Sequence, residues 1–170
     1  YEPRVAETPL TLICSTNPVL ALDGVKCLIK SGALVNRKAT SGISPILAAA
    51  RASSIWYSEP NAGDLIRELV QAGSEANDEF KDRTTALHAC INKRELGVSL
   101  DAVNALLCAG ADPDKGPVDR TSALVDAIYI YLRSDRQECF EVVEALVDAG
   151  AMVKFPLYRS ERCSEVGSYS

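Results

Sequence analysis

One short motif occurs four times in this chain at nearly constant spacing. Each copy has a Ser or Thr, then a Pro or Ala, then an aliphatic residue. The copies are Thr8-Pro9-Leu10-Thr11, Ser44-Pro45-Ile46-Leu47, Thr85-Ala86-Leu87-His88 and Ser122-Ala123-Leu124-Val125. A second motif follows each copy and ends at a glycine, and the four glycines (Gly32, Gly73, Gly110, Gly150) lie 41, 37 and 40 residues apart. This period predicts a stack of similar units that buries one continuous core and leaves a long face free for a partner.

Both motifs have the chemistry of helix ends. Ser and Thr accept hydrogen bonds from the first N–H groups of a helix, and a Pro such as Pro9 lacks a donor where none is needed. Before each glycine, aliphatic residues recur three and four positions apart, as in Val25, Leu28 and Ile29, which predicts an amphipathic second helix. The glycine then suits the left-handed residue that ends a helix. Each unit is therefore expected to contain two helices, with polar turns such as 112–117 between units.

These motifs resemble those of the ankyrin-repeat family. The matching residues are the four Thr-Pro-Leu-His-type motifs, the second helices ending in Gly-Ala, and Gly110-Ala111-Asp112; together they extend from about Glu7 to Val153. The resemblance implies an all-α solenoid of four ankyrin-like helix-turn-helix repeats joined by β-hairpin or turn links, with a concave face that recognises proteins. The implied repeat domain spans residues 1–153, with units at about 7–39, 40–80, 81–117 and 118–153, and residues 154–170 are expected to form a C-terminal cap or a disordered tail.

The chain departs from the family in the length of its units. The distances from the Ser or Thr to the following glycine are 24, 29, 25 and 28 residues, longer than the family uses. The extra residues fall between the two helices of each unit. Since a helical turn takes about 3.6 residues, we expect both helices to be longer by about one turn in the second and fourth units.

Composition narrows the choice of partner. The net charge is −5 over 170 residues, whereas binding of nucleic acid needs a basic face. No segment is long and apolar enough to span a bilayer, and the start has no signal-peptide pattern. We expect a protein or extended peptide as partner, no nucleic acid, membrane or small-molecule substrate, and a cytoplasmic or nuclear location. Because the first residue is Tyr1 rather than Met, the chain is expected to be part of a larger protein.

The inventory of catalytic and metal-binding residues is poor. The six cysteines include no C-x-x-C pair, so they are expected to be reduced thiols, mostly in the core, rather than zinc ligands. The only histidine, His88, lies in a repeat motif, where the resemblance implies that it bonds to backbone and steadies the hairpin. No phosphate-binding loop or nucleophile elbow is present. We expect no enzyme activity, no metal and no cofactor.

The resemblance implies that a partner binds at the tips of the links and on the exposed side of the first helix of each unit. Aromatic and basic residues at these places carry the most information, because such residues dominate interface energetics. The candidate partner-binding residues are Arg51, Trp56, Tyr57, Phe80, Lys81, Asn92, Lys93, Asp119, Tyr129 and Arg133.

Several of these candidates leave alternatives open. Trp56 either fills the space between the longer helices or, with Tyr57 and nearby Glu59, forms a cage for methylated lysine. Tyr129 either anchors a partner or lies at the boundary with a further or capping unit. Phe80 is either a projecting anchor or a packed turn residue, and the basic residues offer contacts to an acidic peptide. The function expected is non-catalytic binding of a protein or peptide; a methyl-lysine reader and a structural spacer are the alternatives.

Overall fold

The computed structural model describes residues 7–56, 62–92, 97–117, 121–134 and 136–152. The helices are α1 (Pro9–Cys14), α2 (Pro18–Lys30), α3 (Pro45–Ile55), α4 (Ala62–Gln71), α5 (Ala86–Cys90), α6 (Leu100–Cys108), α7 (Ala123–Ser134) and α8 (Gln137–Asp148). In the described residues the one sheet is a short antiparallel pair, β1 (Ile91–Asn92) with β2 (Gly97–Val98). The predicted all-α class is confirmed.

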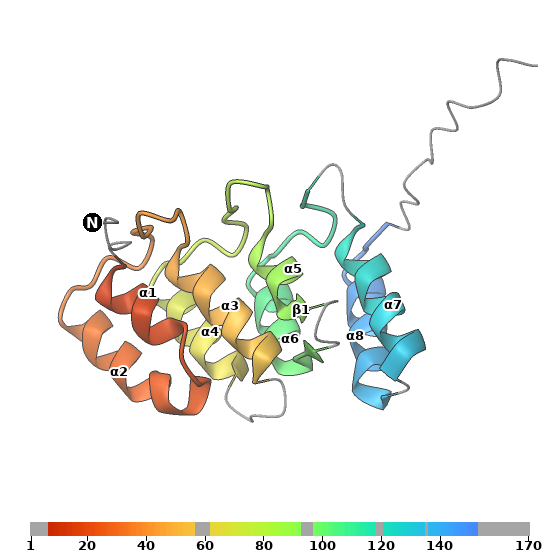
Figure 1. The fold of residues 1–170 in the computed structure, drawn as a ribbon, viewed down its shortest axis with the longest axis horizontal. Helices are drawn as coiled ribbons and strands as arrows, with labels where there is room; N and C mark the ends of the chain where they lie inside the picture. Colours follow the sequence, from red (N-terminus) through yellow and green to blue (C-terminus); the bar gives the residue numbers. More distant parts are fainter. Residues whose placement is uncertain (1–6, 57–61, 93–96, 118–120, 135, 153–170) are drawn as a thin grey trace, which may run out of the picture.

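The helices form pairs that lie side by side in two rows (Figure 1). Helices α1, α3, α5 and α7 make one row, and α2, α4, α6 and α8 make the other. Within the second row each helix contacts the next one, and in the first row α1 contacts α3, which contacts α5. At the last pair α7 packs on β1. The links between successive pairs project at one edge of the molecule, the top of Figure 1.

The four predicted helix starts are confirmed. The hydroxyl of each motif's Ser or Thr accepts a hydrogen bond from the backbone N–H three residues later, as N-capping requires. At Thr8 the bond is 3.0 Å long, and the Thr11 hydroxyl in turn accepts a hydrogen bond from the Thr8 N–H, forming a capping box. The other three caps are Ser44, Thr85 and Ser122.

The four predicted helix ends are also confirmed. Each glycine has φ between 81° and 95°, a conformation that costs glycine little. The N–H of the residue after the glycine then donates to a carbonyl five residues earlier, which completes a Schellman motif. These bonds are Ala33 to Leu28 at 3.0 Å, Ser74 to Leu69 at 2.9 Å, Ala111 to Leu106 at 3.0 Å and Ala151 to Leu146 at 2.9 Å.

The expected lengthening is right for the first helices of the second and fourth units and only partly right for their second helices. Helices α3 and α7 have 11 and 12 residues, against 6 in α1 and 5 in α5. Among the second helices, α8 with 12 residues is longer than α6 with 9, whereas α4 with 10 is shorter than the 13-residue α2. In the third unit the chain between its two helices forms β1 and β2 instead, with Ile91 paired to Val98. These β-branched residues are buried, and they favour an extended backbone.

A ladder of hydrogen bonds from side chains to backbone groups joins successive helix pairs, and it was not predicted from the sequence. Each member stands four residues after a helix-ending glycine. Its oxygen accepts a hydrogen bond from the backbone N–H two residues after the next such glycine. The three steps are Asn36 to Glu75 at 3.3 Å, Asn77 to Asp112 at 2.8 Å and Asp114 to Met152 at 2.9 Å. Both asparagines also donate to the next glycine's carbonyl, at 2.8 and 2.9 Å.

We expect Asn77→Ala to lower the free energy of unfolding by about 1–2 kcal/mol, because two hydrogen bonds between neighbouring pairs are lost. Urea denaturation measures the change. Asn104→Ala is the matched control, since Asn104 on α6 makes no side-chain hydrogen bond to a described residue and alanine favours the helix. Equal destabilisation by both substitutions would contradict the role assigned to the ladder.

Candidate partner-binding groove

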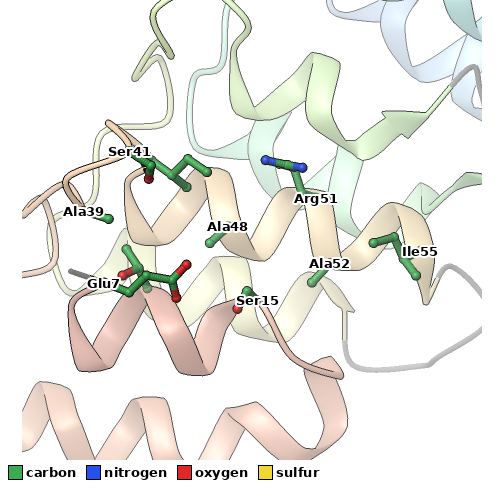
Figure 2. Close-up of a pocket in the computed structure, with 10 residues that line it drawn as sticks. Glu7, Ser15, Ala39, Ser41, Ala48, Arg51, Ala52 and Ile55 are labelled. Atoms are coloured by element: carbon green, nitrogen blue, oxygen red, sulfur yellow. Dashed lines mark hydrogen bonds between the residues drawn. The ribbon is translucent and has the colours of Figure 1, made fainter. Parts of the chain in front are cut away.

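A hollow of about 260 Å³ lies between α1, α3 and the link that joins the first two helix pairs (Figure 2). We call it the groove. Its lining residues are Glu7, Thr11, Ser15, Ala39, Ser41, Ile43, Ala48, Arg51, Ala52 and Ile55. The fold thus brings the predicted candidate Arg51 of α3 together with Ser41 and Ile43 of the link and with Ser15, the C-cap of α1.

One face of α3 forms the apolar wall of the groove. The Ser44 cap fixes where the helix begins, and Ala48, Ala52 and Ile55 follow at spacings of four and three residues. Side chains at this spacing share one helix face. Both alanines are buried at the interface with α1, and their small size leaves room that longer side chains would fill.

The polar groups of α1 are mostly engaged within their own helix. The Thr11 hydroxyl donates to the Thr8 carbonyl at 2.9 Å, and the Ser15 hydroxyl donates to the Leu12 carbonyl at 2.7 Å. Both hydroxyl protons are used in this way, so these two groups can act towards a ligand only as hydrogen-bond acceptors. The charged side chains are the other polar groups to consider.

Two charged side chains of opposite sign line the groove. Glu7 precedes α1 and Arg51 belongs to α3; both are exposed, and in Figure 2 Ala48 lies between them. Neither makes an ion pair or side-chain hydrogen bond with a residue in the described part of the chain. An extended peptide with a carboxylate opposite Arg51 and an apolar side chain against the alanine wall would complement this surface.

Other candidate residues lie away from the groove. Tyr129 and Arg133 are on α7, at the other end of the rows (Figure 1), where the Arg133 guanidinium stands 5.5 Å from the centre of the Tyr129 ring. Lys81 is exposed in the second link, while Phe80 packs against the core. The packed-turn alternative for Phe80 is thus the one observed.

Trp56 is the C-cap of α3, immediately after Ile55 of the groove. Its side chain is 44 % exposed, so the alternative in which it fills an interior space is wrong. Tyr57, Lys93 and Asp119 lie outside the described residues. Asn92 is in β1, and its side chain is likewise not described.

The single histidine has a structural environment. Its Nδ1 lies 3.0 Å from the hydroxyl of Thr85, the cap of its own helix. A Cβ added at Gly116 would lie 2.2 Å from the imidazole ring. The ring therefore packs closely against the link that follows the third pair, which agrees with a steadying role.

The described cysteines are free thiols of two kinds. Cys14, Cys90 and Cys139 are buried, whereas Cys27 and Cys108 are exposed, so the expectation of core cysteines is wrong for these two. Both stand near the end of their helices on the solvent side. In the described part of the chain no three His, Cys, Asp or Glu residues gather as metal ligands would, and no described helix has the length and apolar character needed to cross a bilayer.

Comparison with protein-family models finds no match for this sequence. Comparison with curated proteins finds no match either.

Proposed function

We propose that the chain is a solenoid of four ankyrin-like repeats that binds an extended peptide, or an extended segment of a protein, without catalysing a reaction. Support for the repeats comes from the four capped helix starts, the four Schellman ends and the side-chain ladder, which recur in register along the chain. Such arrays commonly use one long surface for binding.

The groove is the observation that carries the binding proposal. It combines a small-residue wall with an exposed Arg51 that has no ion-pair partner among the described residues. Arginine presents a planar fork of donors that matches a carboxylate. The preferred peptide therefore carries an Asp or Glu beside a small apolar residue and lies extended along α1 and α3.

Selection of peptides from a random display library on the immobilised protein tests this proposal. We expect Arg51→Glu to weaken the selected peptides at least about tenfold, which corresponds to about 1.4 kcal/mol. Binding is measured by fluorescence anisotropy. Arg37→Glu is the matched control, because it makes the same charge change at an exposed residue of the first link, outside the groove.

Two results would contradict the proposal. Failure to enrich any peptide would favour the structural spacer. An equal loss of affinity in the Arg51 and Arg37 variants would show that the overall charge, rather than the groove, governs binding.

A further inference from the structure

Large exposed apolar side chains gather at the two ends of the rows of helices. On the first pair they are Leu12, Val19 and Leu20, and on the last pair they are Tyr129, Leu132, Phe140 and Val147. In the described residues of the two middle pairs, only Ile55 and Trp56 are of this kind. Comparing the burial of equivalent positions in the four helix pairs, counted back from each helix-ending glycine, shows which side of a pair each position faces.

The residue seven positions before each helix-ending glycine faces the next pair. Val25, Ile66 and Val103 occupy this position in the first three pairs, and each is fully buried. In the last pair it is Val143, which is only partly buried. Three residues before the glycine, Val147 is 53 % exposed, whereas its counterparts in the other pairs are partly buried.

The residue four positions before each glycine shows the opposite pattern of burial. Leu69, Leu106 and Leu146, in the second to fourth pairs, are fully buried. In the first pair it is Leu28, which is only partly buried. Two turns earlier on the same face of α2 stands Leu20, which is 78 % exposed. This position therefore faces the preceding pair, and in the described part of the chain no further helix pair packs on this side of the first one.

The two ends therefore correspond in position to the two sides of the contact between neighbouring helix pairs. The chain builds that contact internally wherever α2 meets α4, α4 meets α6 and α6 meets α8. We define the first-pair face as Leu12, Leu20 and Leu28, and the last-pair face as Phe140, Val143 and Val147. Phe140, Val143 and Val147 recur three and four residues apart and so form one stripe on α8.

We propose that two copies of this chain associate head to tail, with the last-pair face of one copy packed on the first-pair face of the other. The contact is heterologous, so each copy keeps one free face and further copies add in a line. Burial of both apolar stripes supplies the driving force. This association is separate from peptide binding, because it uses the ends of the stack and leaves the groove open.

Sedimentation velocity over a wide range of protein concentration tests the proposal. The average mass of the wild-type protein should rise with concentration beyond that of a dimer. Leu20→Glu, which disables the first-pair face, and Val147→Glu, which disables the last-pair face, should each remain monomeric. Both side chains are exposed, so neither substitution should prevent folding, which circular dichroism verifies.

A mixture of the two variants gives the decisive result. The Val147 variant keeps its first-pair face and the Leu20 variant keeps its last-pair face, so an equimolar mixture should reach twice the monomer mass and no more. Leu34→Glu is the control; its side chain is 68 % exposed in the first link, outside the groove and outside both faces, and the variant should associate like wild type. A wild-type protein that stays monomeric, including one in which residues 153–170 cover the last pair, would overturn the proposal. So would a mixture that stays monomeric.

Discussion

Replacing Leu106 with alanine is expected to lower the free energy of unfolding by about 3–5 kcal/mol. Leu106 lies on α6 between α4 and α8, and its side chain is fully buried. Its loss leaves a cavity at an internal helix pair, where each pair depends on both neighbours. Urea denaturation followed by circular dichroism measures the change, which should appear as a lower midpoint.

Cys108→Ala provides the comparison for that experiment. Cys108 is two residues further along the same helix and is exposed, so its replacement should change the free energy of unfolding by less than about 0.5 kcal/mol. If Leu106→Ala proved as mild as Cys108→Ala, α6 would not be packed between α4 and α8.

The second large effect is a loss of stability in alkaline solution. Burial raises the pKa of the Cys14 thiol to about 12 from its ordinary value of 9.0. Burial likewise raises the pKa of Cys90 to about 12, with a hydrogen bond from Ser53 acting weakly in the other direction. Above the ordinary pKa the unfolded chain releases these two protons and the folded chain keeps them. Stability contributed by the neutral thiols is therefore complete below pH 9 and falls as the pH rises towards 12.

At about pH 10 each thiol should cost the folded state roughly 1.4 kcal/mol, or about 3 kcal/mol for the pair. Urea midpoints at about pH 8 and pH 10 give the difference. Tyrosine and lysine side chains also titrate in this range, so the Cys14→Ala, Cys90→Ala double variant is measured in parallel. Between about pH 8 and pH 10 the free energy of unfolding of this double variant should fall by about 3 kcal/mol less than that of the wild-type protein. Identical slopes would show that these thiols ionise as readily in the folded protein as in the unfolded one.

Local features of the fold could be predicted from the sequence because they depend on neighbouring residues. A Ser or Thr such as Ser44 caps the helix that follows it within three residues, and a glycine such as Gly110 ends its helix through bonds within five residues. Both kinds of signal act over one helical turn. Their repetition at regular spacing also predicted the four helix pairs that the described residues form.

Features that depend on distant partners could not be predicted in this way. The hydrogen bonds of Asn77 could not be predicted from its neighbours in sequence, because the groups that it bonds lie 33 and 35 residues further along the chain. The β1–β2 pair forms between the two helices of the third unit because Ile91 and Val98 become buried against other elements. Tertiary packing determines both the Asn77 hydrogen bonds and the β1–β2 pair, and it overrides local conformational preference.

For the candidate binding residues, too, positions set by local sequence could be predicted, whereas exposure set by tertiary packing could not. Arg51 was assigned to the exposed side of a predicted first helix, and the structure puts it in the groove. The aromatic candidates were chosen for residue type, which does not fix exposure: Phe80 packs inward, while Trp56 lies at the surface. Glu7 was missed because it precedes the first helix, and only the packing of α1 on α3 brings it to the groove.

Mapping of a selected peptide by amide chemical-shift changes in isotope-labelled protein tests the central claim most directly. We expect the largest changes at Ser15, Ser41 and Arg51, which line the groove. The amides of Lys30 and Gln71, at the ends of helices in the other row, should barely move. Changes centred on Lys30 and Gln71, with the groove unaffected, would contradict the claim that this chain binds peptides between α1 and α3.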